Sequence, residues 1–283
     1  MEKIILGFFQ NLNINYTPKL TINETAIDFQ NTRLKMIESR KRDVIKSDTF
    51  IQKFQGFSDN LIIDDIEREF QNGNDVNPHL SRQAIKPDYD DMLLNDWGIH
   101  HMHISNTRKN PNQYFYDRSD QLLFIKVLEE NIYFVEIRSH NENLVFCRNE
   151  LIEIINKNWP KLINTYQLNC VSLEKDFTEE ERSIFRKAGV TIPTEINDKF
   201  YFSPGGGYAT SGKNIPCVDA ADSLVKNLRD IESNIKAKEK NFMILISGKV
   251  QKTIKDLSIE LVFNDPNYLV IEKNTGIRLF EIG

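Results

Sequence analysis

Residues near the middle of the chain alternate between polar and apolar in the manner of a β-strand. In a strand, successive side chains point to opposite faces of the sheet. The run 99–105 therefore places His101 and His103 on one face, and Met102 and Ile104 on the other. This period predicts a strand with one apolar face and one face that carries histidines.

A second run, 131–140, follows the same period. Its predicted apolar face carries Tyr133, Val135 and Ile137. Its predicted polar face carries Glu136, Arg138 and His140. The run 122–128 is apolar on both faces except for Lys126, as is typical of a central strand, and the short turn after it predicts an antiparallel hairpin. If the apolar faces pack on one core, the polar faces form a single surface, which we call the histidine surface. Its members are His101, His103, Glu136, Arg138 and His140.

Helical periodicity dominates the N-terminal third of the chain. Residues 1–85 are predicted to be mostly helical, with one helix from Asn23 to Ile45 and another over 61–70 that stops at Gly73. Residues 86–165 then hold the small antiparallel sheet together with short helices.

The last part of the chain, residues 166–283, reads as a separate unit. A capping box at Thr178 predicts a helix, and the run 218–235 predicts a long amphipathic helix. Four short apolar runs follow, the first of them over 242–246, and predict a β-meander. The whole pattern predicts an α+β fold with a helical N-terminal region, a small antiparallel sheet with helices, and a C-terminal helix plus β-meander.

Basic residues concentrate between Arg33 and Lys53, a stretch that contains seven basic and three acidic residues. The densest point is the triplet Arg40, Lys41 and Arg42. On a helix this run is either a solvated face or a contact for nucleic acid or a partner. The predicted substrate contacts are Arg40, Lys41, Arg42, Arg118 and Lys126.

Composition narrows the class of protein. Apolar residues make up 40% and charged residues 27%, as in ordinary globular proteins. No apolar run approaches the roughly 18–20 residues needed to span a bilayer, so we expect no membrane contact and a cytoplasmic location. The net charge of −5 argues against a protein that coats nucleic acid with its whole surface, although a local basic groove is compatible with it. The three cysteines are widely spaced and are expected to be reduced and mostly structural.

The histidine surface combines residue types that suit acid–base chemistry near neutral pH. When the 2′-oxygen of an RNA strand attacks the adjacent phosphate, cleavage needs a base, an acid and a group that stabilises negative charge, but no metal or cofactor. His101 or His103 and His140 are the candidate base and acid, with Arg138 and Lys126 on the phosphate. Alternatively, the same residues form a solvated polar face, or bind a protein partner without catalysis.

A metal site is a further alternative. His101-Met-His103 has the spacing of the HUH nucleases, which pair two metal-binding histidines with a tyrosine nucleophile. Here the candidate tyrosines are Tyr114, Tyr116 and Tyr166. No cysteine lies at ligand spacing from the histidines, so the sequence predicts no tightly bound divalent metal.

Residues 207–213 have the Gly-x-x-x-x-Gly-Lys spacing of a phosphate-binding loop. However, Asn214 stands where the motif needs a Ser or Thr hydroxyl, and Pro216 follows within the first helical turn. We therefore predict that the glycine run 205–207 turns tightly against another segment, and that the loop binds neither ATP nor GTP.

The segment from Asp88 to Pro160 resembles the core of RelE/HigB-like toxins. The matching features are 97–104 as a first strand, 121–127 as a second, and Ile132 to His140 as a third that ends in a basic residue. The resemblance implies helices before a three-stranded antiparallel sheet, with basic or acid–base residues on the sheet face that cleave RNA. It suggests a bacterial toxin-like or phage-defence ribonuclease that acts on RNA or the ribosome.

Overall fold

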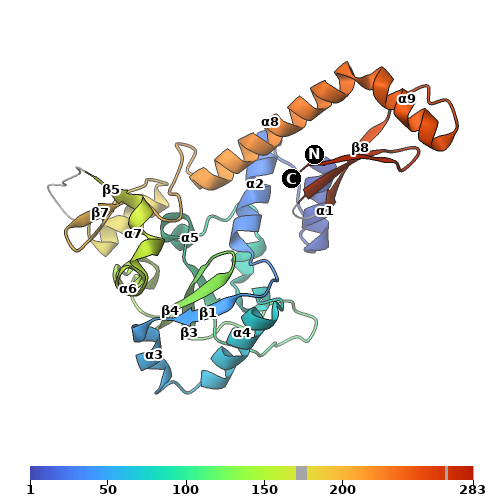
Figure 1. Cartoon of the computed structure of the whole chain (residues 1–283). Helices are drawn as coiled ribbons and strands as arrows, with labels where there is room; N and C mark the ends of the chain where they lie inside the picture. The colour runs from blue at the N-terminus through green and yellow to red at the C-terminus, as the bar shows by residue number, and fades with distance from the viewer. Residues whose placement is uncertain (170–176, 265–266, 283) are drawn as a thin grey trace. The chain divides into compact units, whose positions relative to one another are not determined.

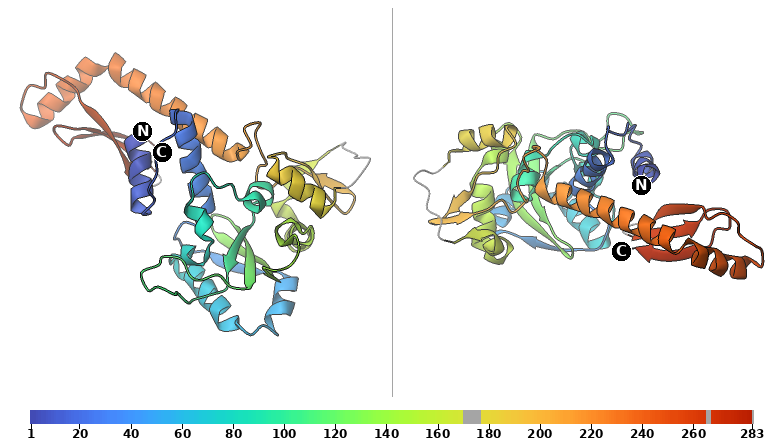
Figure 2. Two further views of the ribbon diagram at one scale, coloured as in Figure 1. Left: turned by 180° about the vertical axis from the view of Figure 1, so that it is seen from behind. Right: turned by 90° about the horizontal axis from the view of Figure 1, so that it is seen from above.

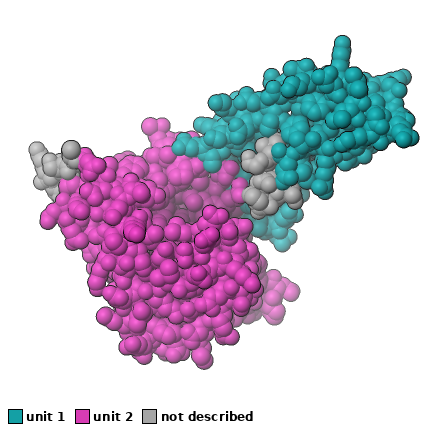
Figure 3. Space-filling view, in the orientation of Figure 1, with its two compact units in different colours: residues 1–29, 219–283 teal, residues 30–218 magenta. Residues whose placement is uncertain are grey.

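The computed structural model describes residues 1–169, 177–264 and 267–282. The chain divides into two compact units, residues 30–218 and residues 1–29 with 219–283 (Figure 3). Helices and three small sheets make up the described chain, which confirms the predicted α+β fold. The division into units differs from the three consecutive regions expected from the sequence. In the smaller unit, apolar residues from both ends of the chain form one cluster: Ile5, Phe9, Ala26, Phe29, Ala221 and Val225.

A four-stranded sheet forms the centre of the larger unit (Figure 1). Its order is β1 (Asp43–Lys46), β4 (Asn131–Ser139), β3 (Gln121–Val127) and β2 (His100–His103). Strands β2, β3 and β4 are antiparallel neighbours, so the predicted hairpin is confirmed. Strand β1 pairs in parallel with β4 at the other edge.

The prediction of one helix from Asn23 to Ile45 is correct only as far as Lys35. Helix α2 (Ile22–Lys35) ends before the basic triplet, and Ile45 lies in β1. The side chain of Asn77 accepts a hydrogen bond from the Ile37 N–H at 2.7 Å and donates one to the Ile37 carbonyl at 2.8 Å. Because these bonds replace the helical partners of Ile37, the chain leaves the helix and reaches the sheet.

Helices cover both faces of this sheet (Figure 2). Helices α3 (Asp48–Phe54) and α4 (Asn60–Asn72) pack on one face, in a cluster that includes Met102, Ile104 and Ile137. Helix α4 ends at Gly73, which has a φ of 75°, as the sequence predicts. On the other face, α5 (Met92–Trp97) and α6 (Glu150–Asn158) pack in a second cluster.

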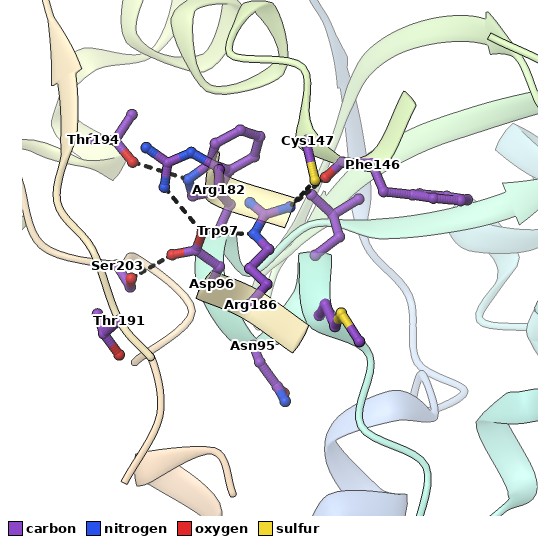
Figure 4. A network of polar contacts seen from close by, with 12 residues as sticks. Asn95, Asp96, Trp97, Phe146, Cys147, Arg182, Arg186, Thr191, Thr194 and Ser203 are labelled. Carbon is purple, nitrogen blue, oxygen red and sulfur yellow. Dashed lines mark hydrogen bonds and ion pairs between the residues drawn. The ribbon is translucent and has the colours of Figure 1, made fainter. Parts of the chain in front are cut away.

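A smaller sheet in the same unit has the order β5 (Gln167–Leu168), β7 (Lys199–Tyr201) and β6 (Thr194–Ile196). Helix α7 (Glu179–Lys187) begins with the predicted capping box of Thr178 and Glu181. Arg182 and Arg186 of α7 meet the Asp96 carboxylate of α5 (Figure 4). This contact joins the smaller sheet and α7 to the central sheet.

The glycine run lies against the end of α5. The Gly205 N–H donates to the Asp96 carbonyl at 2.8 Å, and Gly206 and Gly207 have φ of 97° and 72°. The predicted tight turn is confirmed. Asn214 caps helix α8 (Ile215–Ala237), because its Oδ1 accepts from the Cys217 N–H, and Lys213 pairs with Asp90 at 2.8 Å. The lysine of the motif is therefore engaged with a carboxylate.

Replacement of Gly205 by alanine is expected to lower the free energy of unfolding by roughly 2–3 kcal/mol. An added Cβ would overlap the Leu94 carbonyl and lie 2.6 Å from the Asn95 carbonyl oxygen and 2.7 Å from the Gly98 nitrogen. Urea denaturation measures the change. Gly56→Ala is the control, since no atom lies within 4 Å of its added Cβ. Equal stabilities of the two variants would contradict the close approach.

The smaller unit contains α1 (Glu2–Asn11), α9 (Glu239–Val250) and a meander of β8 (Ile259–Asn264), β9 (Asn267–Glu272) and β10 (Arg278–Ile282). The predicted meander is confirmed, but the strand predicted over 242–246 is helical and belongs to α9. A run of a few apolar residues shows neither the helical nor the strand period, so the sequence could not distinguish a helix from a strand over 242–246. Among the described residues, no helix has the length and apolarity to cross a membrane.

Candidate functional site

The members of the histidine surface do lie on one face of the central sheet. His101 pairs with Phe124 of β3, which pairs with Glu136 of β4. Two residues further along each strand, His103 pairs with Leu122, which pairs with Arg138. These residues share a face because the pairing of the three strands keeps their alternation in phase.

Tyr133 and Val135 depart from the prediction, because they lie on the opposite face from Ile137, and Tyr133 contacts Trp159 there. A register shift between Phe124 and Ile125 leaves Val135 as an extra residue in β4. Val135 therefore packs with Phe124 in the second cluster, on the same side as Glu136, whereas Ile137 packs in the first. A bulge of this kind breaks the two-residue period, and the sequence carries no sign of it.

Three histidines lie close together on this face, and we call His101, His103 and His140 the histidine cluster: the first and last contact the ring of Phe146, and His103 stacks on His140. The ring of Phe146 lies 4.8 Å from that of His101 and 6.0 Å from that of His140. The rings of His103 and His140 are stacked at 6.0 Å. The surface expected from the sequence is thus partly covered, with His103 buried and His101 and His140 half-buried.

Helix α5 and helix α7 hold this cover in place. Asp91, the N-cap of α5, has its Oδ2 3.7 Å from Nδ1 of His101. Arg186 of α7 donates a hydrogen bond to the carbonyl of Phe146. Asp96 of α5 binds the same guanidinium at 2.8 Å. Sequence reasoning missed Asp91 and Arg186, because both act through contacts between distant segments.

Burial controls the protonation of these histidines. It lowers the pKa of His103 to about 4, with further lowering from His101, His140 and Arg118. Burial also lowers the pKa of His101, against the opposing effect of Asp91. Both imidazoles are therefore neutral at pH 7. The carboxylate of Asp91 lies 3.7 Å from Nδ1 of His101, beyond hydrogen-bond distance, and acts on the imidazole through its charge.

Lys126 is not available to a substrate, contrary to the prediction. Its ammonium is buried and donates to the Trp97 carbonyl at 3.2 Å. Burial lowers its pKa to about 8. Lys126 lies on the same face as Tyr133, where α5 covers the sheet. The sequence placed Lys126 on a central strand, but it did not show that a helix packs over this side chain.

The basic triplet lies far from the histidine cluster. Arg40 pairs with Glu129 at 3.2 Å, and Arg42 is buried and donates to the carbonyls of Leu128 and Glu38. These residues precede β1 at one edge of the sheet, while His101 and His103 lie in β2 at the other. Lys41 is exposed at the same remote end. Arg118 is the exception among the predicted contacts, because it is exposed and lies close enough to His103 to lower its pKa.

Glu136 and Arg138 form part of an ion-pair network. The Glu136 carboxylate binds Lys53 at 2.5 Å and also the guanidinium of Arg138, which reaches Glu142 at 2.7 Å. Arg148 continues the network from Glu142. Since each charge has an opposite partner, we assign Glu136 and Arg138 to holding β4 rather than to contacting substrate.

His79 is a buried histidine that the sequence did not single out. Its Nδ1 lies 3.3 Å from the carbonyl of His103, and its Nε2 lies 3.2 Å from Oε2 of Glu69. Its ring also contacts Tyr116 at 4.6 Å. No local pattern could have indicated this residue, since its partners come from α4, from β2 and from the loop before β3.

Among the residues that the structure describes, no group of three or more His, Cys, Asp or Glu side chains is arranged to hold a metal ion. Of the tyrosines considered as nucleophiles, Tyr114 donates to Asp75 at 2.6 Å, and burial together with this carboxylate raises its pKa. Cys147 and Cys217 are buried free thiols, and Cys170 lies outside the described residues.

In comparisons with known proteins, no family model, no curated protein and no solved structure matches the chain.

Proposed function

We propose that the histidine cluster cleaves RNA by acid–base catalysis, as a toxin-like or phage-defence ribonuclease would. The observation that carries this proposal is the gathering of three imidazoles, two of them against the ring of Phe146 and the third stacked on His140. The exposed Arg118 lies close enough to His103 to lower its pKa. The order of elements adds support, since helices precede the antiparallel strands β2, β3 and β4, as the resemblance to RelE/HigB-like toxins implies. The parallel strand β1 at the edge of this sheet is not part of that resemblance.

In the proposed reaction, the imidazole of His101 takes the proton of a ribose 2′-hydroxyl, and the charge of Asp91 stabilises the imidazolium that forms. The 2′-oxygen attacks the adjacent phosphorus, and the bond to the 5′-oxygen breaks. His140 donates a proton to that leaving oxygen. The products are a 2′,3′-cyclic phosphate and a free 5′-hydroxyl, and Arg118 stabilises the charge that develops on the phosphate.

Incubation of the purified protein with a single-stranded RNA of mixed sequence, in the presence of EDTA, tests the proposal. Mass spectrometry of the fragments should show 2′,3′-cyclic phosphate ends. RNA that remains intact at high enzyme concentration would instead favour a non-catalytic interaction protein, and cleavage only with added divalent metal would favour an HUH-like nuclease.

His140→Ala is expected to reduce RNA cleavage by about 100-fold or more while the melting temperature changes little. His140 follows the last residue of β4 and is half-buried, and its ring lies 6.0 Å from those of His103 and Phe146, so its removal opens no fully buried cavity. Arg40→Ala is the control, because Arg40 lies at the opposite edge of the sheet. Equal cleavage by the wild type and His140→Ala would refute the assigned role. A large fall in the melting temperature would mean that His140 is structural.

A further inference from the structure

A cavity of about 660 Å³ lies within the smaller unit, bordered by α8 and the meander. Its lining on α8 includes Val225, Leu228 and Ile235, which recur at the spacing of one helical face. Its lining on the meander includes Ile259 and Leu261, which lie two residues apart in β8 and so share one face of the sheet. An apolar helix face and an apolar sheet face therefore border the same space.

The size of this cavity suits a small molecule. Protein interiors are close-packed and hold few voids larger than a water molecule. Ligand sites occupy roughly 300–1,000 Å³, and the volume of about 660 Å³ falls within that range. Apolar side chains on either side of a gap lose their dispersion contacts, so a ligand that fills the space restores them.

The uncharged part of the lining favours a hydrocarbon chain. Among the described residues, no aromatic ring, hydroxyl or side-chain amide lines the cavity. A flat aromatic ligand would find no ring to stack on, and a ligand rich in hydroxyl groups would find no neutral side-chain partner. An extended aliphatic chain needs neither.

Four charged side chains complete the lining, and their pairing leaves one cation available. Glu232 and Lys236 bind each other at 2.6 Å. Glu239 lies in the first turn of α9, where the helix end stabilises a carboxylate. Arg229 is exposed on α8 and has no ion pair within the part of the chain that the structure describes. A guanidinium that is free to pair favours a carboxylate, which it binds through two parallel hydrogen bonds.

We propose that the smaller unit binds a straight-chain aliphatic carboxylate, with the hydrocarbon chain in the cavity and the carboxylate on Arg229. One carboxylate suits the site better than two, because Glu232 and Glu239 repel further negative charge. The histidine cluster belongs to the larger unit, so this proposal does not depend on RNA cleavage.

Isothermal titration calorimetry with the full chain tests the proposal at pH 7.5. Three probes with the same hydrocarbon chain are compared below their micelle-forming concentrations: decanoate, decanol and decyltrimethylammonium. Decanoate is expected to bind saturably and about tenfold more tightly than decanol, since only decanoate pairs with the guanidinium. Decyltrimethylammonium is expected to bind no more tightly than decanol.

Arg229→Gln removes the charge of an exposed side chain and is expected to leave folding intact. It should weaken decanoate binding about five- to tenfold and leave decanol binding unchanged. Arg278→Gln, at an exposed arginine of β10 outside the lining, is the matched control and should bind decanoate like the wild type.

Leu228→Glu tests the place of the hydrocarbon chain. It puts a carboxylate into the cavity at a half-buried position of α8, and glutamate is a good helix former, so the helix should persist. Binding of decanoate and of decanol should both be lost, while circular dichroism confirms that the variant is folded.

Three results would overturn the proposal. The first is no saturable binding of decanoate by the wild type, or an equal affinity for decyltrimethylammonium. The second is an equal loss of decanoate binding in Arg229→Gln and Arg278→Gln, which would mean that net charge rather than contact attracts the ligand. The third is unchanged binding by folded Leu228→Glu, which would place the ligand elsewhere.

Discussion

Asp96→Asn is expected to lower the free energy of unfolding by about 3–5 kcal/mol, the largest effect of any single substitution considered for this protein. The Asp96 carboxylate binds Arg186 at 2.8 Å and Arg182 at 3.2 Å, and accepts a hydrogen bond from Ser203 (Figure 4). All four side chains are almost fully buried. An asparagine has nearly the same volume but no charge, so it leaves two buried guanidinium groups without a counter-ion.

Urea denaturation at pH 7 measures this loss. Glu129→Gln is the matched control, since it removes the carboxylate of an exposed pair with Arg40 and should change stability by less than about 1 kcal/mol. A similar small effect of Asp96→Asn would show that the two arginines find other partners or water. Because Arg186 also donates a hydrogen bond to the carbonyl of Phe146, we expect Asp96→Asn to reduce the proposed RNA cleavage as well.

Lowering the pH from 7 to 4 is expected to remove stability through His100 and His103. Burial lowers the pKa of each to about 4, whereas an unfolded chain titrates near 6.5. Between these values the unfolded chain binds protons that the folded protein does not, so the free energy of unfolding falls as the pH falls. Each histidine contributes about 2–3 kcal/mol, present in full above pH 6.5 and lost by pH 4.

Denaturation curves at pH 7.5, 5.5 and 4.5 test this expectation by comparing the wild type with His100→Gln/His103→Gln. Carboxylates titrate in both proteins, so the difference between the two pH profiles isolates the histidines. The variant should be less sensitive to acid by several kcal/mol across the window. Parallel profiles would show that these imidazoles bind protons in the folded protein as readily as in the unfolded chain.

The sequence by itself determined the elements whose signals are local. The two-residue period around His101 and His103 predicted their shared face, since alternation in a strand needs no distant partner. The capping box at Thr178 predicted the start of α7, because both of its hydrogen bonds form within four residues. The glycine run 205–207 predicted a tight turn, because residues with a positive φ favour glycine.

Tertiary structure alone decided which of these residues are accessible. Lys126 and Arg42 are candidate substrate contacts in the sequence, but both are buried in the structure. Lys126 donates to the Trp97 carbonyl of α5, and Arg42 donates to the Leu128 carbonyl. Ile45 joins β1 because it finds β4 as a parallel partner, a pairing between residues almost ninety positions apart. A periodic pattern shows which face a side chain is on, but not what covers that face. For this reason the sequence predicted an open histidine surface, and only the packing of Phe146 on His101 and His140 showed that it is a partly covered cluster.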